Sequence, residues 1–262
     1  MKLFNLLNHT NLNNYIIVFG VLMLVSNLNA VGQDISPIQT DRPDQTETPF
    51  TVPKNHFQME NGFSYEQTDD NTRSFTIPST LFKYGLNDHF EIGLITELAT
   101  IKSFTKITGL SPVTFRIKDK IADENGILPT TSIICYMTIA DLASDNLKAK
   151  YLAPAFKFTM QHTLSKKFSL GYNLGVQWDG ESPYHVYIYT LTTDYFISDK
   201  IGIFAEVFGF ATKNSKADNR LNTGLIFLLR HNVSIDISGG IGLSDNSPKY
   251  FLETGFSFRL KD

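Results

Sequence analysis

Alternating residues constrain this chain more than any other feature of its sequence. In residues 168–178, large apolar side chains occupy every second position, and small or polar side chains occupy the positions between them. Residues 233–242 repeat the pattern, with a glycine at one of the apolar positions. Because successive side chains of a β-strand point to opposite faces, each run predicts a strand with one apolar face and one polar face.

Four short polar turns lead directly into such runs. They begin at Asn87, Ser165, Ser198 and Arg230. A polar turn that joins two-faced strands is typical of a β-hairpin. A series of hairpins with one apolar face favours a sheet that closes on itself, and a transmembrane β-barrel is one of the few folds of this kind.

About twelve strands are expected from His56 onward, and most have the roughly 9–11 residues that a tilted membrane strand needs. The expected strands are 56–67, 73–85, 89–98, 110–119, 127–139, 150–163, 167–178, 184–197, 200–211, 220–230, 232–243 and 249–260. An even number of strands places both termini of the chain in the periplasm. The expected extracellular loops lie near 68–73, 99–109, 140–149, 179–183, 211–219 and 243–248. We therefore predict an all-β fold, an antiparallel up-and-down transmembrane barrel with an extended N-terminal segment.

Bulky apolar residues share one face of the expected sheet, and small and charged residues share the other. In a soluble barrel the apolar face would fill the interior, whereas in a membrane barrel it faces lipid. Aromatic residues make up 13% of the chain, which suits the aromatic girdles of a membrane barrel. A secreted soluble β-protein that binds a ligand would share this bias, so it remains an alternative.

Residues 1–32 predict a secretory signal peptide. Lys2 supplies positive charge, and residues 15–25 form an apolar core of 11 residues. A membrane helix would need about 20 residues. Ala30 and Gly32 satisfy the small-residue rule for cleavage, which we expect after Gly32. Export and a barrel together predict the outer membrane, and the terminal amphipathic strand resembles the closing strand that the barrel-assembly machinery recognises.

Residues 33–55 differ from the barrel, which we expect to span 56–262. They contain four prolines and no alternating run, and proline removes the donors that a strand needs. One interpretation is a loose periplasmic tail. The other is a plug inside the lumen, in which Asp41, Arg42, Pro43 and Asp44 would dock against the charged face of the barrel.

Charged residues on the polar face are the candidates for a solute path. Those that we single out are Glu60, Glu91, Arg116, Lys157, Asp194, Glu206, Asp236 and Glu253. On the lipid face an Arg or Lys at the midplane would cost about 2–4 kcal/mol, so charged side chains belong in the lumen. There they would set the charge preference of a pore or form structural ion pairs, and the sequence leaves both open.

Other functional classes find little support. A net charge of −3 without a basic cluster speaks against nucleic acid as a partner. A barrel phospholipase needs a His and a Ser two residues apart, and His231 and Ser234 lie on opposite faces instead. The histidines and acidic residues form no metal-binding pattern, and Cys135 has no partner for a disulfide. We predict no catalytic residue, no metal and no cofactor.

Two stretches carry a family resemblance. The first is 40–50 with its Asp-Arg-Pro run, together with the Val-Pro turn and strand start at 52–60. The second is the hairpin at 81–91. Both resemble the bacterial family named for the MetA-pathway of phenol degradation, often described as transporters. Asn55 stands where glycine is common in that turn, a mild departure because asparagine also tolerates positive φ.

The resemblance implies an outer-membrane barrel that passes small compounds, hydrophobic or aromatic ones among them. We therefore expect a passive channel or transporter for small solutes. The alternatives are an exported barrel with a structural or ligand-binding role and, less favoured, a barrel enzyme.

Overall fold

The computed structural model describes residues 36–213 and 215–261. The expected signal peptide and residues 33–35 of the proline-rich part lie outside the described residues. Within them, no helix is long and apolar enough to cross a membrane.

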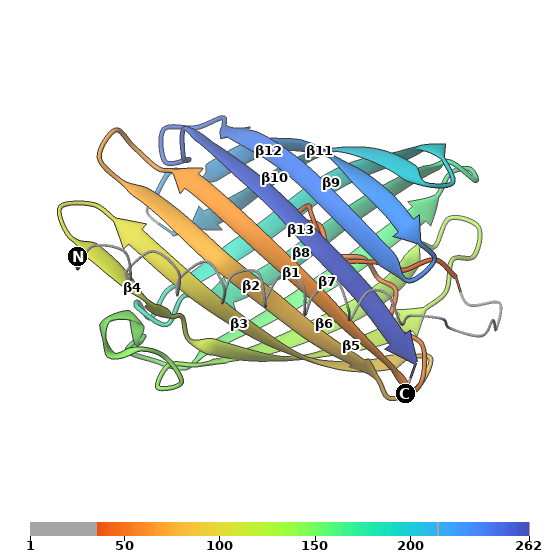
Figure 1. The fold of residues 1–262 in the computed structure, drawn as a ribbon, viewed down its shortest axis with the longest axis horizontal. Helices are drawn as coiled ribbons and strands as arrows, with labels where there is room; N and C mark the ends of the chain where they lie inside the picture. The colour runs from red at the N-terminus through yellow and green to blue at the C-terminus, as the bar shows by residue number, and fades with distance from the viewer. Residues whose placement is uncertain (1–35, 214, 262) are drawn as a thin grey trace, which may run out of the picture. The chain divides into compact units, whose positions relative to one another are not determined.

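The regular secondary structure of the described chain is almost entirely β (Figure 1). Its strands are β1 (His56–Gln67), β2 (Arg73–Gly85), β3 (Phe90–Lys102), β4 (Lys106–Leu110), β5 (Val113–Ala122), β6 (Thr130–Ile139), β7 (Ala153–Thr163), β8 (Phe168–Trp178), β9 (His185–Ser198), β10 (Ile201–Thr212), β11 (Asp218–Arg230), β12 (Val233–Gly242) and β13 (Tyr250–Lys261). A single 3₁₀ turn, Asp145–Leu147, lies between β6 and β7. Most expected strands match to within three residues.

The strands form one closed antiparallel barrel. Consecutive strands pair with each other except for β4 and β5, and β13 pairs with β1 to complete the ring. β4 and β5 share one position, because both pair with β3, along 98–102 and along 90–95 respectively. Thirteen strands therefore make a barrel of twelve positions, which confirms the predicted fold.

The prediction of one continuous loop at 99–109 is wrong. β3 continues to Lys102, and Lys106–Leu110 forms β4 after a short turn. Pro112 explains the interruption before β5, since proline has no N–H to give to a neighbouring strand. The five residues of β4 are too few to show alternation on their own.

Burial in the barrel is inverted relative to a soluble protein. On β5, Phe115 and Ile117 are 49% and 52% exposed, whereas Arg116 and Lys118 between them are 2% and 0% exposed. Large apolar side chains cover the outside of most strands in the same way. Such a surface suits lipid and is unfavourable in water, so the fold is that of a transmembrane barrel.

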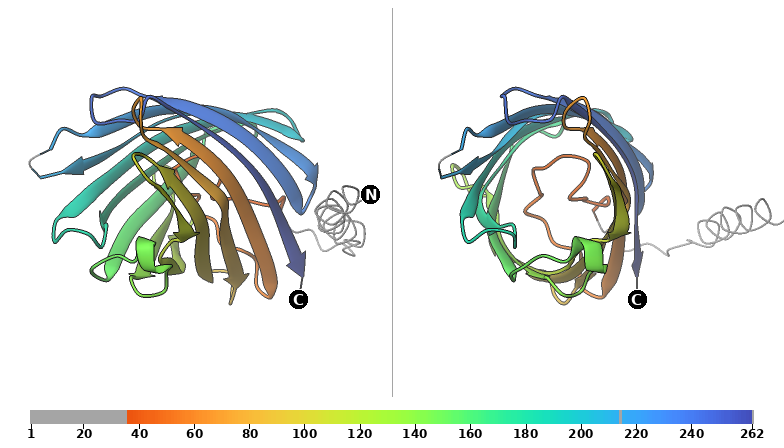
Figure 2. Two further views of the ribbon diagram at one scale, coloured as in Figure 1. Left: turned by 60° about the vertical axis from the view of Figure 1, so that its left-hand side comes forward. Right: turned by 90° about the vertical axis from the view of Figure 1, so that its left-hand side faces the viewer.

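The two ends of the barrel differ. We call the end that holds the start of β1, the end of β13 and the turns 86–89, 123–129, 164–167, 199–200 and 231–232 the terminal rim. The opposite end, with loops such as 68–72, 140–152 and 243–249, is the loop rim. All four polar turns of the sequence lie at the terminal rim. The right-hand view of Figure 2 looks along the barrel and shows residues 36–55 inside the ring of strands.

Candidate functional site

Residues 36–55, the N-terminal segment, form a loop whose two ends lie at the terminal rim. At its start, Ile38 N donates to His231 O over 2.8 Å, and Arg259 Nη2 donates to Ser36 O over 2.6 Å. At its end, Asn55 N donates to Gly85 O over 2.9 Å. Asn55 has a φ of 58°, the left-handed conformation in which asparagine is tolerated, and the chain turns there into β1.

Asp41 is the most heavily bonded group of this segment. Its carboxylate lies 2.9 Å from Lys83 Nζ, 2.9 Å from Lys118 Nζ and 3.1 Å from Arg116 Nη2. All four side chains are buried. Burial by itself would raise the pKa of Asp41, but Lys118, Lys83 and Arg116 hold that pKa well below its usual range. The segment is therefore pinned by a carboxylate that stays ionised.

Glu60 of β1 reinforces the ion pairs that hold Asp41. Its carboxylate accepts a hydrogen bond from Asp41 N over 2.9 Å and lies 2.7 Å from Lys83 Nζ. Lys118 Nζ also donates to Thr48 O over 2.8 Å. The charges of β1, β2 and β5 therefore bind both the side chain and the backbone of the segment.

Glu47 makes a second attachment further along the segment. It lies 2.6 Å from Lys157 Nζ and 3.2 Å from Arg116 Nη1, and Tyr136 Oη donates to it. Burial opposes ionisation of Glu47, but Lys157 and Arg116 outweigh it and the pKa is lowered. Asn173 pairs with the Glu47 backbone, accepting from its N–H over 2.7 Å and donating to its carbonyl over 3.0 Å.

Glu206 of β10 binds Gln45 and Thr46, which form the tip of the segment. It accepts hydrogen bonds from Gln45 N over 3.0 Å and from Thr46 N over 2.6 Å. Thr46 Oγ1 also lies 2.7 Å from Thr190 Oγ1. The tip is therefore fixed to β9 and β10 as well as to β2, β5 and β7.

Arg42 lies in a notch made by two glycines. Gly62 of β1 and Gly255 of β13 face each other across the closing pair of strands. A Cβ at Gly62 would come within 2.0 Å of Arg42 Nη1, and one at Gly255 within 2.5 Å of Arg42 Nε. Arg42 Nη2 lies 3.3 Å from Asp236 and donates to Thr254 O over 3.2 Å. Without side chains at these two positions, the guanidinium can approach the wall.

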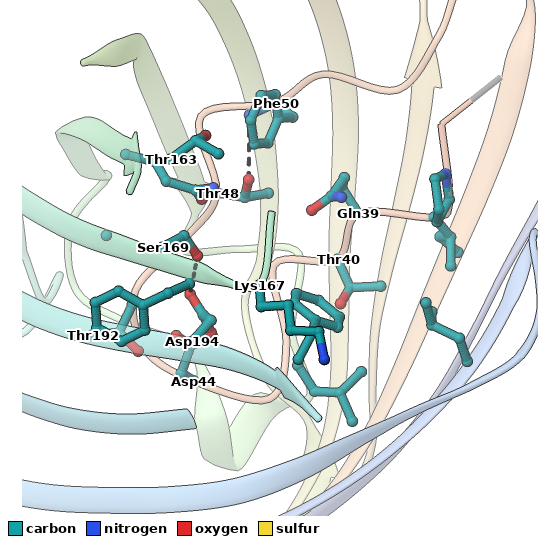
Figure 3. A pocket seen from close by; sticks show the side chains of 18 of the residues that line it. Gln39, Thr40, Asp44, Thr48, Phe50, Thr163, Lys167, Ser169, Thr192 and Asp194 are labelled. Atoms are coloured by element: carbon teal, nitrogen blue, oxygen red, sulfur yellow. Dashed lines mark hydrogen bonds between the residues drawn. The ribbon is translucent and has the colours of Figure 1, made fainter. Parts of the chain in front are cut away.

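Two cavities flank the segment. The larger, of about 760 Å³, opens toward the terminal rim between the segment and β7–β11 (Figure 3). We call it the terminal cavity. The smaller, of about 270 Å³, lies toward the loop rim and is lined by Ser64, Thr76, Glu97 and Glu253 among others. Arg42, Asp44 and Glu47 line both cavities, so the tip of the segment stands between them.

A family model described as "Putative MetA-pathway of phenol degradation" matches residues 40–260. The chain belongs to this family. No curated protein matches it. Among solved structures, an outer membrane channel from Pseudomonas putida F1 is similar with a TM-score of 0.62 and 11% identity, over 80% of this chain and 97% of that one. The NanC porin has a TM-score of 0.54 and 12% identity, over 78% of this chain and 100% of that one. These likenesses show the same fold.

In this member of the phenol-degradation family, most of the predicted path residues contact the N-terminal segment. Glu60, Arg116, Lys157, Glu206 and Asp236 bind it as described above. Glu91 accepts a hydrogen bond from Val52 N over 2.8 Å and lies 3.1 Å from Arg116. 

The remaining two path residues are different. Asp194 and Glu253 are half-buried and have no ion pair among the described residues. Asp194 lines the terminal cavity, and Glu253 lines the smaller one. Of the motif residues, Pro43 is buried and Asp44 is half-buried between the cavities.

Sequence reasoning missed Lys83 and Glu47. The pairing of β2 with β3 shifts between Thr76 and Ser79, which breaks the alternation that would have placed Lys83. Counting back in steps of two from Gly85 would have found it. Glu47 lies in a segment without periodicity, so no pattern marks it. The described residues contain no group of His, Cys, Asp or Glu that could hold a metal ion.

Proposed function

We propose that this protein is a passive outer-membrane channel for small solutes, closed by its N-terminal segment. The observation that carries the proposal is the pair of cavities on either side of the segment tip, within a closed barrel that has a polar lumen. A solute that crosses from one cavity to the other has to displace Arg42, Asp44 or Glu47. Transport along such a path needs no catalytic group and no cofactor.

The terminal cavity supports small amphipathic solutes, including aromatic ones. Its volume of about 760 Å³ is within the range of roughly 300–1,000 Å³ that is typical of small-molecule sites. Apolar side chains such as Phe50, Phe196 and Ile226 line it together with polar ones. The family description, which refers to phenol degradation, fits the same class of solute.

The orientation in the membrane belongs to the same proposal. The terminal rim would face the periplasm, with the loop rim outside. The signal peptide would be cleaved after Gly32, so that the N-terminal segment starts at the periplasmic end. The barrel-assembly machinery would recognise β13, in which bulky apolar residues alternate with small or charged ones up to Leu260.

Deletion of residues 33–52 tests the closure. We expect a clear rise in single-channel conductance in planar bilayers, because the deletion joins the two cavities. Gel migration before and after heating would show that the shortened barrel still folds, a necessary control because Lys118 and Lys157 lose their partners and Lys83 keeps only Glu60. An unchanged conductance would contradict a plug and favour a structural role for the segment.

A reversible crosslink tests whether the intact segment has to move. Thr46 Oγ1 and Thr190 Oγ1 lie 2.7 Å apart, so cysteines at these positions can approach each other as a disulfide requires. In the T46C/T190C/C135S variant, oxidation should abolish openings and reduction should restore them. The T46C/C135S variant is the matched control and should not respond. Equal conductance of the oxidised and reduced double-cysteine protein would mean that solutes pass a stationary segment.

A further inference from the structure

The terminal cavity has an acidic inner end. Asp44 of the segment and Asp194 of β9 both line it and lie beside each other (Figure 3). Asp194 accepts one hydrogen bond, from Ser169 Oγ over 3.1 Å. Neither carboxyl has an ion pair among the described residues, in contrast to Asp41 and Glu47.

The basic residues of the same cavity lie at its mouth. Lys166, Lys167, Lys200 and Arg230 belong to the turns of the terminal rim or border them, and all four are exposed. Water and salt screen exposed charges far more than half-buried ones. Arg42 also lines the cavity, but it is paired with Asp236. The two carboxyls at the inner end are therefore the ones in this cavity that lack a basic partner.

A buried hydroxyl at the same place lacks a well-formed hydrogen bond. Thr192 is 3% exposed and lines the cavity, and its Oγ1 has no hydrogen bond of good geometry, only a weaker interaction with the Asp44 carboxyl. It is two residues from Asp194 on the same face of β9, so both side chains are directed into the lumen. A buried hydroxyl without a well-formed hydrogen bond is unfavourable, and a polar group of a ligand would satisfy it.

Apolar side chains make up part of the remaining wall, beside neutral polar ones such as Gln39, Thr40 and Gln161. Ile38 and Phe50 come from the segment, and Phe196, Ile226 and Leu228 come from β9 and β11. A ligand that suits the whole cavity has an apolar body and one end that carries positive charge and hydrogen-bond donors.

We propose that the terminal cavity is a binding site for organic ammonium ions, with Asp194 and Asp44 as the ammonium partners and Thr192 as a hydrogen-bonding neighbour. The site takes a single-ring or short-chain amine whose apolar part packs on Phe50, Phe196 and Ile226. This inference rests on the proposed channel function, for which it names a substrate class. Amines would be the solutes that bind beside the tip of the N-terminal segment.

The environment of Asp44 agrees with this assignment. Burial, Glu206 and Asp194 raise the pKa of Asp44 well above its usual range, so the ionised carboxyl lacks a counter-charge. A bound ammonium supplies that charge and takes the place of the proton.

Calorimetric titration of the full-length protein in nanodiscs tests the site, with empty nanodiscs as the control for partition into lipid. The probes are benzylammonium, benzyl alcohol and benzoate, which share a ring and differ in charge. We expect benzylammonium to bind about tenfold or more tightly than benzyl alcohol, because a hydrogen bond to a charged partner is worth roughly 1.5–3 kcal/mol. Benzoate should bind most weakly.

Two isosteric variants, one in β9 and one in the N-terminal segment, test which carboxyl binds the ammonium group. Asp194→Asn and Asp44→Asn should each remove most of the preference for benzylammonium over benzyl alcohol. Asp123→Asn removes the same charge from a turn of the terminal rim outside the cavity and should leave the preference unchanged. Equal binding of the three probes, or a full preference in both cavity variants, would overturn the inference.

Arabinose influx into liposomes separates this inference from the channel function. If arabinose enters and benzylammonium shows no preference, the channel stands and the amine site is wrong. If benzylammonium binds as expected and arabinose does not enter, the site stands and the proposed channel is wrong.

Discussion

At the scale of single residues, the attachment of the N-terminal segment depends on two glycines of the barrel wall as much as on charges. The Arg42 guanidinium occupies the space that Cβ atoms at Gly62 and Gly255 would take. The atoms that a Cβ at Gly62 would meet all belong to the far end of Arg42, so this position separates attachment of the segment from folding of the wall.

We therefore expect Gly62→Ala to displace Arg42 and leave the barrel intact. Loss of the contacts to Asp236 and Thr254 should raise the fraction of time that the channel is open, measured in planar bilayers. Gly202→Ala is the matched control, since its Cβ would approach only the Phe196 ring, at 3.3 Å. If Gly62→Ala lowered the unfolding temperature of the barrel and left opening unchanged, the notch would be a packing feature of the wall alone.

At the scale of strands, the two faces of one strand should respond oppositely to charge. On β12, Ile237 is 53% exposed on the lipid side, whereas Asp236 and Ser238 on either side of it are buried toward the lumen. Ile237→Arg should destabilise the barrel by about 2–4 kcal/mol near the midplane. Ile237→Val should cost no more than roughly 1.5 kcal/mol. Urea unfolding in lipid vesicles measures both, and similar losses would contradict a lipid-facing position.

The strand scale is also where sequence prediction succeeds and fails most clearly. Period-two alternation identifies β8 and β12 because one face of each strand contacts only lipid and the other face contacts only the lumen. It fails where pairing shifts, as at Thr76 and Ser79, and where Pro112 divides one position into β4 and β5. The site is less predictable, because the partners of Asp41 come from β2 and β5 and are fixed only when the barrel closes.

At the scale of the whole molecule, carboxyls of the segment respond to pH in opposite directions. The lowered pKa of Asp41 means that its contribution to docking is present above its ordinary value of 3.8 and is lost only when the pH falls through the lowered pKa. The raised pKa of Asp44 has the reverse sign. Docking favours its protonated form, so this contribution is strongest below 3.8 and is lost as the pH rises through the raised pKa.

We expect the channel to open more often as the pH is raised from 3.8 through the raised pKa of Asp44. Asp44→Asn should abolish this trend and favour the closed state at high pH, because the amide stays neutral. Single-channel recordings across that range measure the effect in both proteins. A trend that persists unchanged in Asp44→Asn would assign it to another group, and the Asp123→Asn variant controls for loss of a charge at the rim.

The position of the segment at the beginning of the chain has a consequence for the order of folding. Arg259 donates to the carbonyl of Ser36, 223 positions earlier in the sequence. The first residues of the described chain can take their final places only after the last strand has been synthesised and the ring has closed. Contacts between such distant residues form slowly, because a long loop has to close before they gain anything. The contact between Ser36 and Arg259 is therefore expected to be among the last of the fold to form.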